Sequence, residues 1–437
     1  MLSFLQRDLP GLAAIYFPGN GPPPDGAFAR LASLGISAEE GRVDETHWAL
    51  RLSHPEWGTA TLVAPREPIP VNEVMAFAIS ITDAEKAAAA GANAVVHVSV
   101  PARKKHILRD RKLLLRWAQA VMGEDGVLAV DLSSTLPWSR AGLTDELAHD
   151  ADLDVEAIYC IHQVMADEDG RTEWLHTHGL GEVGGFDFDV LRPHPAFVAA
   201  CSEPFRALAF QVIGGEVTNR SDRHPLGSGF DIRLVPAGQF RRSAAPEDLA
   251  LMDDPNGFHV PDRAVICEPA GRKLFGFGGG GEEPRPHRLP QKGEISDRAV
   301  LYFPTWANEV MAERARATFD LLPAYVDEFA EFEVQPILKI GYPTDSGETR
   351  EHLWFSFHGM VDGQIDATLE SEPFAIARMK TGQRGLHPLD QLSDWIVITP
   401  AGWITPRSQR PARTLRENRE EIRADFATWK AEQGRRT

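Results

Sequence analysis

Four consecutive glycines, Gly278–Gly281, lie within a stretch of glycine, proline and charged residues that spans residues 271–293. Glycine gives the backbone too much freedom for a stable helix or strand, and prolines such as Pro284 and Pro286 cannot donate hydrogen bonds to a sheet. A phosphate-binding loop would need a lysine followed by serine or threonine after the glycines, and this pair is absent. The stretch therefore predicts a flexible Gly/Pro-rich linker that divides the chain in two.

Length and composition predict a globular protein with more than one core. A chain of 437 residues exceeds what one ordinary domain buries, and 43% apolar with 25% charged residues is a typical globular composition. The net charge of -18 disfavours contact with nucleic acids or anionic membranes, because their phosphates would be repelled. We therefore predict neither a nucleic-acid partner nor a membrane partner.

Three cysteines, Cys160, Cys201 and Cys267, lie far apart and form no C-x-x-C pair. This sparse, odd-numbered set favours reduced thiols in a core over a disulfide framework. The first residues lack the basic segment and apolar run of a secretory signal, and no stretch approaches the roughly 18 apolar residues of a membrane helix. The sequence thus predicts a cytoplasmic protein.

The order of apolar segments predicts the fold class. Strands alternate with helices and then give way to hairpins, which is typical of α+β layers. The fold class that we predict is α+β, with two or three small units, mainly antiparallel sheets and helices packed on one face. We expect an N-terminal α+β subdomain at 1–67, a central α+β domain at 68–270, the linker at 271–293, and a C-terminal α+β domain at 294–437 that ends in an amphipathic helix at 415–429.

Short sequence patterns in the C-terminal domain match a known family. They are Ala315–Phe319 on a helix, Glu351–Phe355 on a strand, Gly363–Asp366 after a turn, Glu372-Pro373, Gly382 and Asp394-Trp395. With this spacing the stretch from Met311 to Trp395 resembles the bacterial family catalogued as domain of unknown function 2314, which usually has aspartate where this chain has Gln383. The upstream segment Trp174–Leu180 is similar to a companion family, domain of unknown function 4026. Neither resemblance implies an established activity.

The hairpin around His176 and His178 is the sharpest candidate for a chemical site. Alternate strand residues share a face, and a loop at 181–184 would place His178 opposite Asp187 and His176 opposite Asp189. Two imidazoles facing two carboxylates are suited to a zinc or iron site or to acid–base catalysis. The alternative is a set of cross-strand charge pairs on a solvated face. Because no third histidine has metal-ligand spacing nearby, we predict no bound metal and no cofactor.

A second candidate is a basic stripe on the helix predicted at 105–122. Lys105, Arg109, Lys112 and Arg116 share one narrow face of this helix, and apolar residues on the opposite face would anchor it. We expect the four cations to be presented outward, where they would meet an acidic protein partner or an anion. The alternatives are a helix face that is simply solvated and a self-association site that meets the protein's own acidic surface.

Trp354 and Trp395 are predicted in the core, with a groove as the alternative. Serine-hydrolase elbows, kinase loops, dinucleotide fingerprints and zinc ribbons are absent from the sequence. The leading hypothesis is therefore a non-catalytic protein-binding or accessory protein, such as one that neutralises a toxin, since acidic binders capture basic targets by charge complementarity. The competing hypothesis is a metal-assisted hydrolase that uses the His176/His178 hairpin.

Overall fold

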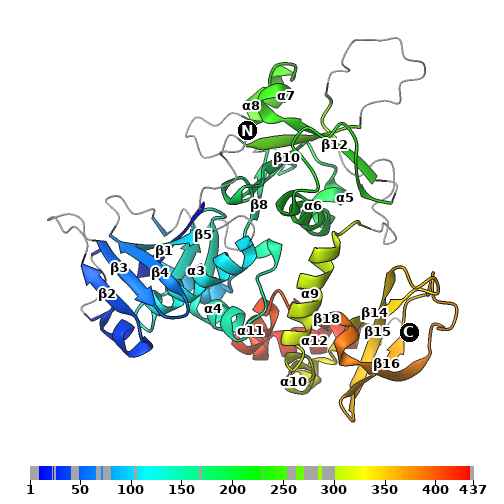
Figure 1. The fold of residues 1–437 in the computed structure, drawn as a ribbon. Helices are drawn as coiled ribbons and strands as arrows, with labels where there is room; N and C mark the ends of the chain where they lie inside the picture. The colour runs from blue at the N-terminus through cyan, green and yellow to red at the C-terminus, as the bar shows by residue number, and fades with distance from the viewer. Residues whose placement is uncertain are drawn as a thin grey trace.

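The computed structural model describes residues 9–21, 23, 26–40, 49–64, 70–71, 80–102, 106–166, 170–228, 230–252, 262–269, 284–287 and 301–433. These residues form three β-sheets that follow one another along the chain, each with helices packed against it (Figure 1). Most strand pairs are antiparallel, which confirms the predicted α+β class.

The first sheet has seven strands in the order β2-β3-β4-β5-β1-β6-β7. Its strand β1 (Leu9–Phe17) pairs with β5 (Ala94–Ala102) and β6 (Leu128–Asp131), and helix α3 (Ile107–Met122) packs on the sheet. Strands from both sides of residue 67 share this sheet, so the boundary predicted there does not separate two units. The remaining elements are η1 (Ala29–Leu34), β2 (Ser37–Glu40), β3 (Ala49–His54), β4 (Gly58–Val63), α2 (Asp83–Ala89), β7 (Leu136–Ser139) and α4 (Arg140–Leu147).

The second sheet has six strands in the order β11-β12-β13-β10-β9-β8. The predicted hairpin is present, since β9 (Thr172–His178) pairs antiparallel with both β8 (Cys160–Met165) and β10 (Asp187–Leu191). One face packs against helices α5 (Pro195–Ala200) and α6 (Ser202–Gly214), and side chains of the other face contact α7 (Ala237–Phe240) and α8 (Pro246–Leu251). The remaining elements are η3 (Val155–Ala157), η4 (Gly181–Val183), β11 (His224–Gly227), β12 (Phe230–Pro236) and β13 (Arg263–Cys267), which pairs parallel with β10.

The third sheet belongs to the predicted C-terminal domain and has six strands in the order β17-β16-β15-β14-β18-β19. Its buried face carries large apolar side chains such as Phe355 and Trp395. The single terminal helix predicted at 415–429 is instead two helices, α11 (Arg410–Glu417) and α12 (Arg419–Gln433), which are separated at Asn418. The remaining elements are α9 (Thr305–Ala317), α10 (Leu321–Glu328), η5 (Ala330–Phe332), β14 (Gln335–Pro343), β15 (Arg350–Val361), β16 (Gln364–Leu369), β17 (Arg384–Pro388), η6 (Leu389–Gln391), β18 (Leu392–Thr399) and β19 (Gly402–Ile404).

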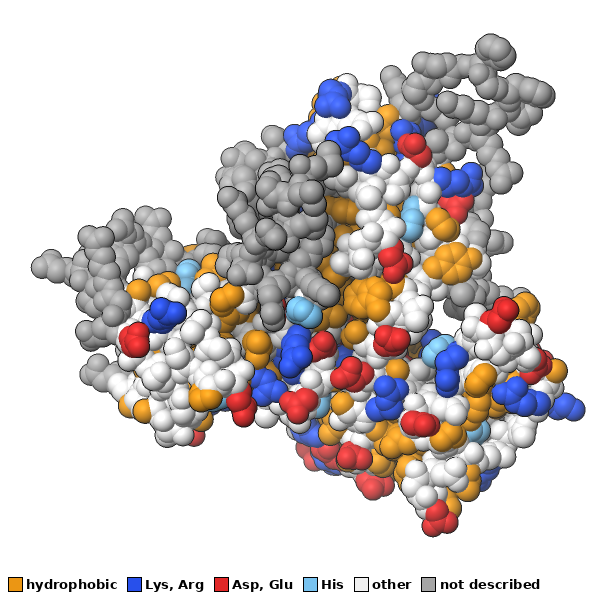
Figure 2. Space-filling model, viewed as in Figure 1, with side chains coloured by type: hydrophobic (Ala, Val, Ile, Leu, Met, Phe, Trp, Pro, Cys, Tyr) orange, Lys and Arg blue, Asp and Glu red, His pale blue; other side chains and the backbone are white. Residues whose placement is uncertain are grey.

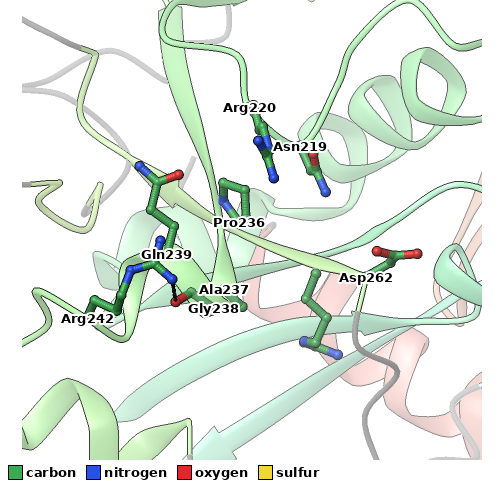
Figure 3. Close-up of a pocket in the computed structure, with 9 residues that line it drawn as sticks. Asn219, Arg220, Pro236, Ala237, Gly238, Gln239, Arg242 and Asp262 are labelled. Carbon is green, nitrogen blue, oxygen red and sulfur yellow. Dashed lines mark hydrogen bonds between the residues drawn. The ribbon is translucent and has the colours of Figure 1, made fainter. Parts of the chain in front are cut away.

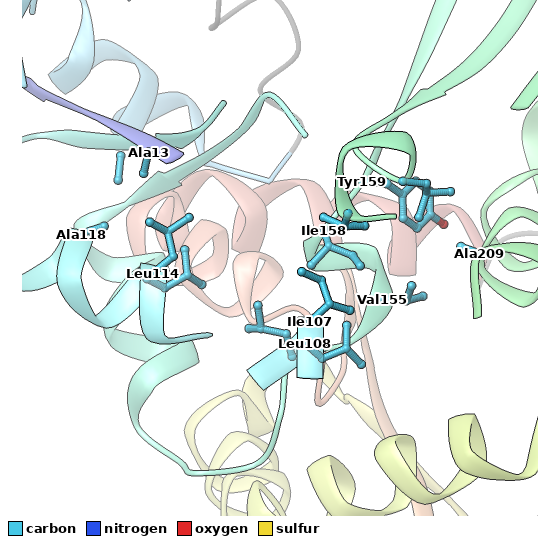
Figure 4. Packing of buried hydrophobic residues seen from close by; sticks show 14 of the residues in the cluster. Ala13, Ile107, Leu108, Leu114, Ala118, Val155, Ile158, Tyr159 and Ala209 are labelled. Carbon is cyan, nitrogen blue, oxygen red and sulfur yellow. The ribbon is translucent and has the colours of Figure 1, made fainter. Parts of the chain in front are cut away.

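One apolar core joins the first two sheets. Ile107 and Leu108 of α3 lie near Val155 and Ile158 of the segment that leads into β8 (Figure 4). The same cluster continues to α6 and to Ala307 at the beginning of α9, whereas Ala315 near the end of α9 belongs to the core of the third sheet. Helix α9 therefore connects the two cores (Figure 1).

Ion pairs between arginines and carboxylates also hold the C-terminal domain against the rest of the chain. Both Nη atoms of Arg314 on α9 lie 2.8 Å from the carboxylate of Glu146 on α4. Arg407, which follows β19, approaches Glu156 to 3.2 Å. Arg413 of α11 pairs with Glu85 of α2 at 2.9 Å.

Most of the predicted linker at 271–293 lies outside the described residues, so its flexibility stays a prediction. Residues 284–287 are described and lie along β13. Pro286 forms a bridge with Cys267, and the His287 N–H donates to the carbonyl of Ile266 at 3.0 Å. This end of the predicted linker is therefore attached to the C-terminal end of β13.

Acidic and basic side chains are interspersed over the visible surface, without a large area of one sign (Figure 2). The charge of -18 is thus spread over the molecule on this side. Among the described helices, none combines the length and apolar character that crossing a lipid bilayer requires.

Candidate metal centre

Three histidines from two neighbouring strands meet on one face of the second sheet. His162 on β8 is directly opposite His176 on β9, and His178 lies two residues further along β9. The ring centroid of His162 lies 5.2 Å from that of His176 and 4.4 Å from that of His178. The centroids of His176 and His178 are 4.9 Å apart. One nitrogen of each ring lies within 4.8 Å of the others. We call these three residues the histidine cluster.

The histidine cluster is buried, which corrects the solvated face considered from the sequence. His176 is 3% exposed and His178 is 7% exposed. His176 stacks on Trp174 with ring centroids 3.9 Å apart. Burial removes the imidazoles from water, and a buried polar group is stable only with compensating partners.

The predicted pairing of His176 with Asp189 across β9 and β10 is confirmed. The carboxylate of Asp189 nevertheless accepts hydrogen bonds from elsewhere, from Trp174 Nε1 at 2.9 Å and from the Arg263 guanidinium. Asp189 and Arg263 are both almost completely buried and form an ion pair. Each compensates the charge of the other, which would be costly to bury alone in the sheet interior.

Asp187, the other predicted carboxylate, stabilises the turn after β9. It accepts hydrogen bonds from Thr177 Oγ1 at 2.8 Å and from the backbone N–H groups of Leu180 and Gly181 at 3.2 and 3.0 Å. Burial raises the pKa of Asp187 to about 6, although Arg263 and these hydrogen bonds act in the opposite direction. The turn that carries His178 is therefore held by a buried carboxyl group.

Thr135, in the turn before β7, orients His162. Its hydroxyl donates to the carbonyl of Ser134 at 2.7 Å and lies 3.3 Å from His162 Nε2. A threonine hydroxyl can donate or accept at Nε2, and where it accepts, Nε2 of His162 carries the proton. In this tautomer Nδ1 of His162 has the lone pair, and a hydrogen bond to the other ring nitrogen is the usual support of a metal-bound histidine.

Cys160 lies opposite His178 but is a poor ligand in the metal-free protein. Its Sγ is 3.2 Å from Thr135 Oγ1, and burial raises the pKa of the thiol to about 12. A metal binds the thiolate, which is scarce at neutral pH when the pKa is this high. The three imidazoles are therefore the side chains most available as metal ligands at this site.

The cluster has the right chemistry for a divalent transition metal. Zinc holds imidazole nitrogens at about 2.0–2.1 Å, which places two ligand nitrogens roughly 3.4 Å apart in a tetrahedral site. Nitrogens that lie within 4.8 Å of one another would need to approach by at most about 1.4 Å to reach this spacing. Three protein ligands leave one tetrahedral position for water, which is the arrangement of catalytic rather than structural zinc sites.

Sequence reasoning found His176 and His178 but missed His162. The signal was available, because His162 is one of the alternate residues of β8 that share a face. The register between β8 and β9 decides which β8 residue faces His176, and this register depends on a turn that the pattern does not specify.

The predicted basic stripe is only partly exposed. Lys105 lies outside the described residues, Arg109 is exposed, and Arg116 pairs with Asp150 at 2.8 Å. Lys112 is buried, because its Nζ donates to the carbonyl of Ala151 and lies 3.7 Å from Glu146, and burial lowers its pKa to about 8. The expectation that all four cations face outward is therefore wrong for Lys112, and the loop after α4 is what covers it.

The residues that carry the C-terminal resemblance stabilise the third sheet and its loops. The Glu351 carboxylate accepts the backbone N–H groups of Phe374 and Ala375 at 2.7 and 2.8 Å, and Asp366 forms a two-bond pair with Arg384. Trp395 is in the core as predicted. Trp354 is only half-buried, on the opposite face of the sheet, where Lys339 Nζ lies 5.2 Å from its ring centroid.

The comparisons with known proteins agree with this part of the chain. Residues 309–404 match a family model described as "Uncharacterized protein conserved in bacteria (DUF2314)", as the resemblance predicted. The predicted similarity of the upstream region to domain of unknown function 4026 has no support. No curated protein and no solved structure matches the chain.

Proposed function

We propose that this protein binds a divalent transition metal such as zinc through His162, His176 and His178, and that the metal serves a hydrolytic reaction. The observation that carries the proposal is the third histidine, which brings three imidazole nitrogen donors together in a buried place. The metal-assisted hydrolase was the competing hypothesis from the sequence, and His162 is now added to its ligands His176 and His178. It also replaces the expectation of no metal and no cofactor.

The chemistry follows from the open coordination position. A zinc ion lowers the pKa of bound water to about 7, so that hydroxide is present at neutral pH. The hydroxide oxygen would form a bond to an electrophilic carbon or phosphorus atom of the substrate, and the leaving group would depart with a proton. A cytoplasmic location suits this site, because Cys160 stays reduced in that compartment.

Elemental analysis tests the proposal directly. We expect about one zinc or similar ion per chain after purification, or after loading and desalting. A His176→Ala/His178→Ala variant removes two of the three ligands and should lose the ion, with an affinity at least 100-fold weaker. His149→Ala is the matched control, because this half-buried histidine lies beside Lys112 on another unit. A wild-type chain that holds no ion under either condition would falsify the proposal.

A second candidate function is the protein-binding or accessory role that led the sequence analysis. The observation that favours it is Phe374, which is 97% exposed although the Glu351 carboxylate holds the backbone of its loop in place. Water-exposed aromatic rings on ordered loops often become buried anchors when a partner binds. A partner with basic groups around an apolar pocket would complement both Phe374 and the acidic chain.

The second candidate predicts that Phe374→Ala weakens a purified complex by about 10-fold or more while the melting temperature stays unchanged. Trp429→Ala is the matched control, because Trp429 is also an exposed aromatic side chain but lies on α12. Equal binding by wild type and Phe374→Ala, measured with a partner that binds the isolated chain, would exclude this surface.

A further inference from the structure

A pocket beside the histidine face of the second sheet is rich in arginine. It has a volume of about 360 Å³, which is within the range of small-molecule sites. Asn219 and Arg220 point from one loop toward Pro236, while Gln239 lies on α7 and Arg242 in the turn that follows it (Figure 3). Asp262 and Arg263, where β13 begins, complete the polar wall of the pocket.

Two of the three arginines have no carboxylate partner among the residues that the structure describes. Arg263 is neutralised by Asp189, and Arg242 donates to the carbonyl of Gly238 at 3.1 Å, which leaves its charge uncompensated. Neither Arg220 nor Arg242 forms an ion pair with any residue that the structure describes. In a chain of net charge -18, two unpaired guanidinium groups at one pocket form a local site for an anion.

Arg263 connects this pocket to the histidine cluster. Its guanidinium binds Asp189, which receives the Trp174 N–H, and its Nη1 lies 3.4 Å from the carbonyl of Thr177, between His176 and His178. Asp187 and Arg263 are paired across β10 and β13, so the pocket wall is two strands from β9, or about 10 Å. The pocket and the histidine cluster thus belong to one sheet and are connected by the Arg263–Asp189 pair, whose Asp189 lies opposite His176.

We infer that this pocket binds an oxyanion, either a phosphate or a carboxylate group, and that the substrate of the metal centre carries this group. The second half of the inference rests on the proposed metal-dependent function. Arginine forks match the oxygens of phosphate and carboxylate groups with paired N–H donors, and the amides of Asn219 and Gln239 supply further donors. The Asp262 carboxylate opposes the anion, so it limits the affinity.

The test uses the metal-free full-length chain with inorganic phosphate and succinate as separate probes, at low ionic strength and by calorimetry. We expect at least one probe to bind with a Kd of about 1 mM. Arg220→Gln/Arg242→Gln should raise this Kd at least 10-fold, and Asp262→Asn should lower it several-fold. Phosphate binding alone assigns a phosphorylated substrate, and succinate binding alone assigns a carboxylate. Arg223→Gln is the control, because Arg223 is exposed nearby and pairs with Asp231.

The inference is overturned if neither probe binds, or if the double variant binds as tightly as wild type, or if Arg223→Gln weakens binding equally. Each of these results leaves the elemental analysis untouched. Conversely, probe binding in a chain that holds no metal would keep the anion pocket and remove only its link to the metal centre. In a zinc-loaded chain, the double variant should raise KM for an ester of the favoured anion and leave zinc content unchanged.

Discussion

Replacing Arg314 with alanine is expected to lower the free energy of unfolding by about 3–5 kcal/mol, because the change leaves a buried carboxylate without its partner. The Arg314 side chain is 2% exposed and that of Glu146 is 8% exposed. Arg314 also donates to the carbonyls of Asp152 and Pro406 at 2.9 and 3.0 Å. After the substitution Glu146 retains only Lys112, at 3.7 Å, among the ion pairs that the structure describes.

Urea unfolding followed by tryptophan fluorescence measures this effect. Arg423→Ala is the matched variant, because Arg423 pairs with Glu331 on the surface, where water screens the two charges and the pair adds little to stability. The double variant Arg314→Met/Glu146→Leu removes this pair of buried charges but leaves Lys112 without its carboxylate, so it should recover only part of the loss. If Arg314→Ala and Arg423→Ala unfold at the same urea concentration, the Arg314–Glu146 pair does not stabilise the contact between the C-terminal domain and α4.

The local parts of the fold were predictable from the sequence because they depend on short-range patterns. The alternation of residues 172–191 predicted the hairpin and the pairing of His176 with Asp189, and both are present. Strand β16 and helix α2 likewise follow from a run of alternating residues and from the Thr82–Glu85 capping box.

The long-range parts were not predictable, because they depend on which segments pack together. Lys112 has the helical spacing of an exposed residue, but the loop after α4 covers it. Pro68–Pro70 has the composition of a domain joint, although β4 and β5 on either side pair directly. His162 became a candidate ligand only when the β8–β9 register was known. Each error concerned a contact between residues distant in the sequence or a register set by a turn.

Gly179, the residue after His178, links the fold to the candidate metal centre. Its φ of +116° lies in a region that favours glycine, and a Cβ there would lie 2.4 Å from the carbonyl oxygen of Ile158 and 3.1 Å from Ser134 Cα. Both contacts are with backbone atoms, so no side-chain rotation relieves them. Only glycine allows the end of β9 to pass this close to the segments before β7 and β8.

Gly179→Ala is therefore expected to destabilise the chain by about 2–5 kcal/mol, from backbone strain together with overpacking. The movement that relieves the clash displaces His178 from His162, so zinc affinity should also fall by at least 10-fold. Gly170→Ala is the matched control on the same β8–β9 segment, because Gly170 has a φ of +66° but open space around its Cα. It should cost only about 1–2 kcal/mol and leave zinc affinity unchanged. Urea midpoints and zinc competition titrations measure both quantities, and equal effects of the two alanines would show that close packing at Gly179 does not position His178.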